Sequence, residues 1–117
     1  MTDLETMPDP LLGVPGVQLG GELDISNAQD VQELLDAAIH TSAGAFVVDL
    51  CDVDFLDSTA INLLMRARAQ LGRQERQLVV VCPPGPVRRV FELAGISDLF
   101  ALFGSRAAAA AALVPPD

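Results

Sequence analysis

One stretch, residues 46–64, constrains the fold more than any other part of the chain. It opens with a mostly apolar run of strand length and ends with apolar residues at helical spacing, which predicts a strand followed by a helix. Four carboxylates and a Ser-Thr pair lie between the two elements. In open α/β sheets, the loop after such a strand lies at the carboxyl edge, where ligands and chemistry usually sit. The stretch therefore predicts an α/β fold with a candidate site at the start of this helix.

The start of this helix carries a capping residue and an exposed hydroxyl. Asp57 precedes the first helical residue, and its carboxylate can accept hydrogen bonds from the free backbone N–H groups of the first turn. Ser58 is then the first helical residue, at the positive end of the helix dipole. A phosphate on Ser58 would face those N–H groups, so the fold should tolerate it. It would add roughly −1.5 to −2 charges beside Asp54, Asp57 and Asp24, which predicts a large change in surface potential without unfolding.

Turn signals and apolar periodicity divide the rest of the chain. Residues 1–10 carry two prolines and no periodicity, which predicts a loose N-terminal tail. A small hairpin is expected over residues 11–19, with its turn at the Pro-Gly pair. The Ser-x-x-Gln pattern of residues 26–29 predicts a capping box at the start of a helix that ends near residue 40. The elements expected after it are strand 45–50, helix 58–71, strand 77–82, helix 87–94, strand 99–103 and helix 107–113.

Strands separated by helices imply parallel neighbours joined by right-handed crossovers. The predicted fold class is a single small α/β domain over residues 11–114 with a mostly parallel central sheet of four to five strands. Helices pack on this sheet, and the N-terminal strand is antiparallel. A chain of 117 residues is long enough for one core and leaves little room for a second domain.

The charge of the chain is negative and unevenly distributed. The net charge is −9, which argues against nucleic acid and against an anionic membrane surface, because both need a basic face. Residues 1–65 hold 12 of the 16 acids and no Arg or Lys, so a partner that meets this part of the chain is expected to be basic there. No apolar run reaches transmembrane length, and the acidic N-terminus is unlike a signal peptide. A cytoplasmic protein is therefore expected.

The sequence carries no recognisable catalytic machinery. Its single histidine, His40, falls in the last turn of a predicted helix, and the chain has no lysine, no Gly-x-Ser-x-Gly elbow and no glycine-rich phosphate loop. The four carboxylates of residues 49–57 could offer oxygen ligands to Mg²⁺, but they are expected to be solvated loop carboxylates and one helix cap. Phosphoaspartyl chemistry would need a lysine or a much longer chain. We therefore expect no enzyme activity, no metal and no cofactor.

Three segments together resemble one family. Residues 21–24, Gly-Glu-Leu-Asp, resemble a Gly-x-Leu-Asp motif at the end of an early strand. Residues 47–60 end in Asp-Ser-Thr-Ala, similar to a hallmark Asp-Ser-[Ser/Thr]-[Gly/Ala] motif, and residues 86–95 resemble a helix that ends near glycine. Their order and spacing match over roughly residues 17–114. On these segments the chain resembles the STAS domain, and within it the bacterial anti-sigma factor antagonists.

This resemblance implies a protein that binds an anti-sigma factor with a kinase-type ATPase fold. That partner would phosphorylate the first hydroxyl after the motif aspartate, which here is Ser58. The bare form would cause release of the sigma factor, and a phosphatase would reset the cycle. ATP and the catalytic groups would belong to the partner. The residues that the resemblance implies in partner binding are Asp24, Asn27, Asp57, Ser58, Thr59, Ala60 and Asn62.

Two features depart from the family's pattern. Ala60 stands where many members have glycine. The N-terminus is short and proline-rich compared with the family's usual first strand. A weak first strand would leave a sheet edge open to another chain, and a homodimer through that edge is one expectation.

Two other functions stay open at this point. A STAS domain could be an interaction subunit of another machine, such as a lipid-transport ABC complex. Alternatively, Cys51 and Cys82 could form a redox-sensing pair. Each cysteine ends an apolar run, so buried, reduced thiols are expected in a cytosolic protein. A redox pair would require that their strands are neighbours and that their side chains converge.

Overall fold

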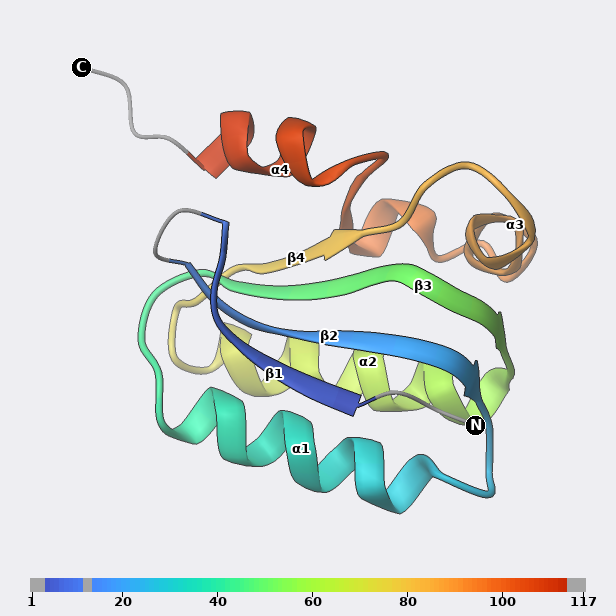
Figure 1. Cartoon of the computed structure of the whole chain (residues 1–117), viewed down its shortest axis with the longest axis horizontal. Coiled ribbons are helices and arrows are strands. Elements are labelled where there is room, and N and C mark those ends of the chain that lie inside the picture. The colour runs from blue at the N-terminus through green and yellow to red at the C-terminus, as the bar shows by residue number, and fades with distance from the viewer. Residues whose placement is uncertain (1–3, 12–13, 114–117) are drawn as a thin grey trace.

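The structure, a computed structural model, describes residues 4–11 and 14–113, with side chains from residue 14 onward. Strands and helices alternate along most of the chain, as the sequence predicts (Figure 1). The elements are β1 (Leu4–Leu11), β2 (Val14–Leu23), α1 (Ala28–His40), β3 (Phe46–Leu56), α2 (Ser58–Gly72), β4 (Leu78–Val81), α3 (Pro86–Leu93), the short 3-10 helix η1 (Ser97–Leu99), β5 (Ala101–Phe103) and α4 (Arg106–Leu113).

The five strands form one sheet in the order β1-β2-β3-β4-β5. Strand β1 is antiparallel to β2, and each of the other neighbouring pairs is parallel. The register places Val17, Val48, Val80 and Leu102 across four consecutive strands. The predicted α/β class, with a mostly parallel sheet and an antiparallel N-terminal strand, is thereby confirmed.

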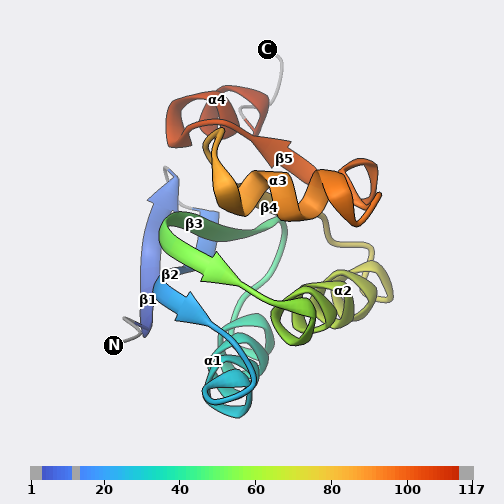
Figure 2. The same cartoon turned by 90° about the vertical axis from the view of Figure 1, so that its right-hand side faces the viewer.

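The helices cover both faces of the sheet, but unequally. From β2 to β5 the strand order advances in one direction, so right-handed crossovers place the three connecting helices on the same face. Helices α1, α2 and α3 accordingly pack into one large apolar core (Figure 2). Among the described helices, α4 is the one that covers part of the opposite face, and its Ala109 is fully buried against Val47, Val79 and Val81. The alanine-rich α4 buries little area per residue, so its helical stability depends on this packing.

The N-terminal region corrects two predictions. Residues 4–10, expected within a loose tail, belong with Leu11 to β1, which pairs with β2. The Pro15-Gly16 pair, expected as the hairpin turn, lies inside β2, and residues 12–13 between the two strands lie outside the described residues. Pro8 and Pro10 in β1 lack the N–H that pairing with a neighbouring strand needs. The β1–β2 register is correspondingly irregular between Met7 and Leu11.

The start of α1 and the end of β3 also differ from expectation. Helix α1 begins at Ala28 with Asn27 as its N-cap residue and without a side-chain cap, so the predicted capping box is wrong. Strand β3 continues to Leu56, well beyond its predicted end at Leu50, because β2 runs beside it as far as Leu23. Irregularities in the β2–β3 register accommodate the extra residues of β3.

Candidate functional site

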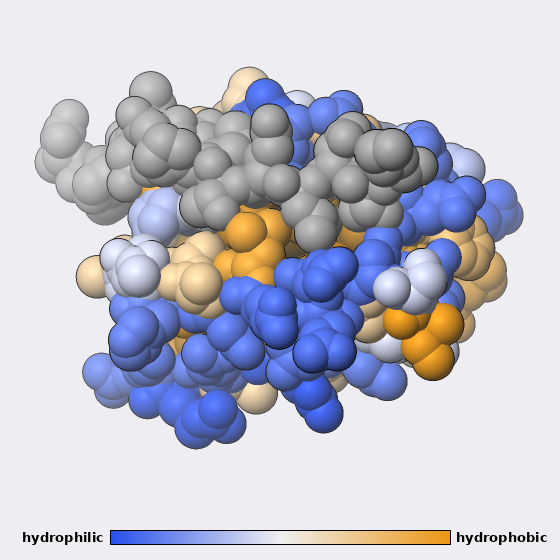
Figure 3. Space-filling view, turned by 60° about the horizontal axis from the view of Figure 1, so that its bottom comes forward, coloured by the Kyte–Doolittle hydropathy of each residue, from blue (hydrophilic) through white to orange (hydrophobic). Residues whose placement is uncertain are grey.

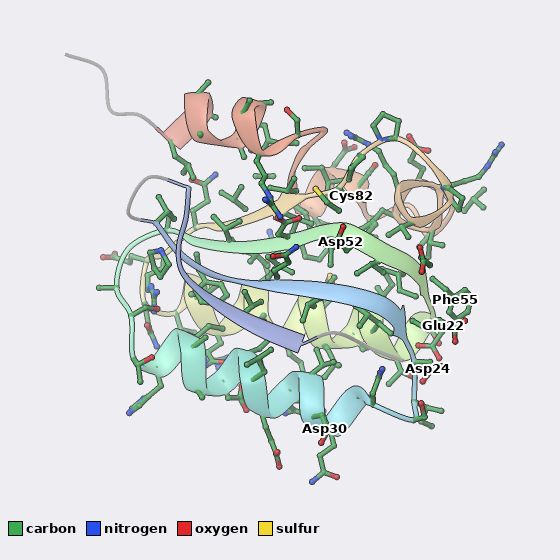
Figure 4. All side chains as sticks on the ribbon, viewed as in Figure 1. Glu22, Asp24, Asp30, Asp52, Phe55 and Cys82 are labelled. Carbon is green, nitrogen blue, oxygen red and sulfur yellow. The ribbon has the colours of Figure 1, made fainter. Side chains whose placement is uncertain are left out.

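The candidate site lies where β2 and β3 end. Leu23 and Leu56 are register partners, and the Asp57 backbone N–H donates to the Leu23 carbonyl at 3.1 Å. This bond ties the turn after β2 to the start of α2. Figure 4 shows Glu22, Asp24 and Phe55 together at this end of the sheet. Two segments that are separated in the sequence by the whole of α1 thus form one continuous surface.

The start of α2 has the predicted geometry. Oδ1 of Asp57 accepts from the backbone N–H groups of Thr59 at 2.9 Å and Ala60 at 3.1 Å, so Asp57 is the N-cap residue of α2. Ser58 is the first helical residue, and its side chain is exposed. The helix dipole and the first-turn N–H groups therefore lie directly beneath an accessible hydroxyl.

A tight turn over residues 24–27 forms the other side of the site. Oδ1 of Asp24 accepts from the Ser26 backbone N–H at 2.9 Å and from the Ser26 hydroxyl. These two bonds hold the pKa of the Asp24 carboxyl below its ordinary value. The carboxylate is therefore ionised at neutral pH and adds a fixed negative charge near the start of α2.

Asn27 closes this turn from within. Its Oδ1 accepts from the Asp24 backbone N–H at 3.0 Å, and its Nδ2 donates to the Glu22 carbonyl at 2.7 Å. Both polar atoms of the Asn27 side chain thus bind the backbone of the turn. In the structure, Asn27 therefore shapes the surface on which Asp24 lies.

A groove between α1 and α2 opens beside this turn. Thr59 and Asn62, both predicted partner-binding residues, line it, and its volume is about 980 Å³. Its other lining residues are Ile25, Ala28, Gln29, Gln32, Glu33, Asp36, Leu63, Met65, Arg66 and Ala69. The start of α2 at Ser58 and the turn over residues 24–27 together form what we call the Ser58 surface. The groove extends this surface along the two helices.

Ala60 lies beneath this surface. It is 3 % exposed, and its side chain is part of the large core. Its methyl group, which a glycine would lack, points into the protein. The backbone N–H of Ala60 contributes to the site by donating to Asp57.

The four carboxylates of the predicted acidic loop lie in different environments. Asp49 is 1 % exposed, and its Oδ2 accepts from Nε of Arg106 on α4, so the prediction that it is a solvated loop carboxylate is wrong. This bond raises the pKa of the Arg106 guanidinium above its usual value. Asp52 is on β3 and accepts from Nε2 of Gln18 at 2.7 Å. Within residues 4–11 and 14–113 no group of acids, cysteines or histidine is arranged to hold a metal ion.

Two residues at the site were missed by the sequence analysis. Ile25 is 79 % exposed in the turn after β2, and Phe55 is 49 % exposed near the end of β3. Each had a signal in the sequence. Ile25 is an apolar residue within a polar turn, and the adjacent Phe55 and Leu56 cannot both face the core of a strand.

The two cysteines do not converge. Asp49 pairs with Val81, so Cys51 and Cys82 lie one register step apart on neighbouring strands. Successive side chains of a strand point to opposite faces, and Cys82 packs in the core under α1–α3 while Cys51 packs under α4. The geometry thus argues against a redox-sensing pair.

Both thiols should react slowly in the folded protein. Burial, followed by the neighbouring Asp49, raises the pKa of Cys51 to about 11. Since the thiolate is the reactive form, iodoacetamide at pH 8 should alkylate Cys51 roughly 100-fold more slowly in the native than in the denatured protein. The native rate should keep rising as the pH approaches 11, because each step deprotonates more thiol. Mass spectrometry of timed samples measures this rate. Cys51 is only partly buried, unlike Cys82, so rapid native labelling would contradict the raised pKa rather than the packing.

No helix in the described part of the chain is both long and apolar enough to cross a membrane.

Comparisons with known proteins agree with this architecture. The family model described as the STAS domain matches residues 11–109. The anti-sigma-F factor antagonist RsfB of Mycobacterium tuberculosis is 30% identical over 93 residues, which cover 80% of this chain and 75% of that protein. The anti-sigma-B factor antagonist of Staphylococcus aureus is 28% identical over 83 residues, covering 71% and 77%. The crystal structure of an anti-sigma factor antagonist from Mycobacterium paratuberculosis matches with a TM-score of 0.85 at 27% identity, covering 97% of this chain and 94% of that one. The chain therefore belongs to the STAS domain family.

Proposed function

We propose that this protein is an anti-sigma factor antagonist that binds an anti-sigma factor of kinase-type ATPase fold through the Ser58 surface. Phosphorylation of Ser58 ends the binding, and a phosphatase restores it, so the protein controls release of a sigma factor and hence transcription. The names of the relatives support the general role. The observation that carries the proposal is the exposed Ser58 hydroxyl at the Asp57-capped start of α2.

The start of α2 suits a residue that must exist in two states. In the bare form, Asp57 satisfies the N–H groups of Thr59 and Ala60, so the helix is stable without a phosphate. In the modified form, a phosphate on Ser58 would lie at the positive end of the helix dipole, which favours negative charge. The modification should therefore leave the fold intact.

The charge around Ser58 explains why modification would end binding. Asp24 is held ionised by Ser26, and Asp57 caps the adjacent helix turn. A phosphate would add roughly −1.5 to −2 charges beside them. A partner matched to the bare surface would then face a larger negative potential and the bulk of the phosphate. Loss of affinity follows without any conformational change in the antagonist.

The chemistry of the transfer is assigned to the partner. The Ser58 oxygen attacks the γ-phosphorus of the partner's ATP, the O–P bond forms as the bond to ADP breaks, and the hydroxyl proton passes to a base on the partner. This chain contributes only the nucleophilic hydroxyl and its position. The lack of lysine and the single histidine in the sequence fit that division of labour.

Two substitutions at Ser58 test this function. Ser58→Ala should bind the anti-sigma factor with wild-type affinity and take up no label from radioactive ATP, because it lacks the accepting oxygen. Ser58→Asp should weaken binding at least tenfold, since it places a carboxylate where the phosphate would stand. Calorimetry measures the affinity, and autoradiography measures the label.

Ser105→Asp is the matched control for added charge. The Ser105 hydroxyl accepts from the Ala108 backbone N–H at 3.1 Å at the start of α4, and Asp caps a helix as well as Ser does. The change thus adds the same charge at a helix start on the other face of the sheet. Binding by Ser105→Asp should equal wild type. If Ser58→Asp also bound as tightly as wild type, the proposed switch would be wrong.

A further inference from the structure

Exposed apolar side chains gather at the Ser58 end of the molecule. The described part of the chain has four exposed large apolar residues, and two of them, Ile25 at 79 % and Phe55 at 49 %, belong to the segments that end beside Ser58. The view of Figure 3 shows an apolar patch at this end of the molecule, bordered by hydrophilic side chains. Apolar exposure rimmed by polar groups is typical of a protein–protein contact.

The turn after β2 holds Ile25 outward. Its flanking residues Asp24 and Ser26 are bonded to each other through side chain and backbone, and Asn27 binds both Glu22 and Asp24. These bonds fix the backbone on both sides of Ile25 without using its side chain. A contact made by Ile25 would therefore cost little ordering of the loop, which is the benefit of a preorganised site.

Phe55 is held outward by the strand that carries it. It is the register partner of Glu22 on β2, and the next residue, Leu56, is buried in the core. Alternation along β3 then directs Phe55 to the surface. Figure 4 shows Phe55 beside Glu22 and Asp24 at the end of the sheet. The two apolar residues thus come from neighbouring strand ends.

The surroundings of these residues indicate the chemistry of what covers them. Four acidic residues, Glu22, Asp24, Asp54 and Asp57, lie on the same strand ends and turns, and the sequence has no Arg or Lys before position 66. Ile25 also lines the groove between α1 and α2 with Thr59 and Asn62, so whatever covers Ile25 also meets the Ser58 surface. The complement of this surface is an apolar pocket bordered by arginine or lysine side chains.

We propose that Ile25 and Phe55 are the apolar anchors of the interface with the anti-sigma factor, and that this partner receives them in an apolar pocket with a basic rim. This inference rests on the proposed function. The anchors lose water only in the bound complex, so they govern the dissociation rate. The carboxylates act at a distance, so they govern the association rate and its dependence on salt.

Alanine substitutions separate the two roles. In surface plasmon resonance with the purified anti-sigma factor, Ile25→Ala should raise Kd about 30-fold and Phe55→Ala about tenfold, nearly all in the dissociation rate. Raising the salt concentration should slow association of the wild type and of both variants by the same factor. Both side chains are largely outside the core, so circular dichroism should show folded variants.

Leu93 provides the matched control. It is 80 % exposed, like Ile25, but ends α3 and is absent from the turn, the strand end and the groove. Leu93→Ala should change Kd less than twofold. The inference is overturned if Ile25→Ala and Phe55→Ala bind like wild type, or if Leu93→Ala weakens binding as much as they do. If the wild type itself bound no anti-sigma factor, the proposed function would be wrong. If the wild type bound but the alanine variants bound equally well, only the role of Ile25 and Phe55 would be wrong.

Discussion

Gly16→Ala is expected to lower the free energy of unfolding by about 3 kcal/mol or more. A Cβ added at Gly16 would lie 2.2 Å from the Val47 carbonyl oxygen and 3.0 Å from the Val47 Cβ. These distances are far inside van der Waals contact, so the backbone of β2 or β3 would have to move. A loss of this size is a large share of the stability of a small domain.

The sheet leaves little freedom for that movement. Val47 is 1 % exposed and lies in β3, where it is the register partner of Gly16 on one side and of Val79 in β4 on the other. Moving Val47 would disturb two ladders at once. Moving β2 instead would displace Val17 and Leu19, which are fully buried under the helices. Either movement would relieve the steric overlap at Gly16 only by disrupting the packing of these buried side chains.

Urea unfolding followed by far-UV circular dichroism measures this loss, because the chain has no Trp or Tyr to serve as a fluorescent probe. Gly72→Ala is the matched control. Gly72 is the last residue of α2, and a Cβ there would meet open space. Since alanine favours a helix more than glycine, Gly72→Ala should stabilise the protein by up to about 1 kcal/mol. A wild-type unfolding midpoint for Gly16→Ala would show that β2 can shift without cost.

The parts of the site that depend on neighbours in sequence could be predicted. Asp57 caps α2 through N–H groups two and three residues away, and the choice of Ser58 as first helical residue follows from that cap. Both are local consequences of side-chain chemistry. The periodicity of the buried strands likewise indicated the parallel sheet, because residues buried on both faces form continuous apolar runs.

The parts of the structure that depend on residues distant in sequence could not be predicted. Pro15-Gly16 has the local signature of a turn, yet it lies within β2 because Gly16 permits the close approach of Val47, which follows only after α1 in the chain. Similarly, β3 extends past its apolar run because β2 supplies pairing partners as far as Leu23. Local turn and polarity signals were overridden by the ladder between the two strands.

Asp49 is the clearest case among the candidate site residues. Its sequence neighbours suggest one member of a solvated acidic cluster, but it is buried on the face of the sheet that α4 covers, and its partner Arg106 is 57 residues away. No local pattern identifies that pair. Because an ionised carboxylate is costly to bury without a partner, the pair fixes where α4 packs.

Arg106→Ala is accordingly expected to destabilise the protein by about 3 kcal/mol, the lower end of the range for breaking a buried ion pair, because the Arg106 side chain is itself 44 % exposed. Asp49 would keep its bond from the Cys51 backbone N–H at 2.9 Å but would lose its counter-ion. Urea unfolding measures the loss. Arg68→Ala, at an exposed position of α2, is the control and should stay within about 0.5 kcal/mol of wild type.

A second substitution separates the charge from the packing of α4. Asn at position 49 can still accept from the Cys51 N–H but carries no charge, so Asp49→Asn combined with Arg106→Ala should recover at least about 1 kcal/mol relative to Arg106→Ala alone. If the double variant were no more stable than Arg106→Ala, the contribution of Arg106 would lie in its packing rather than its charge, because only an unpaired carboxylate is relieved by the change to asparagine.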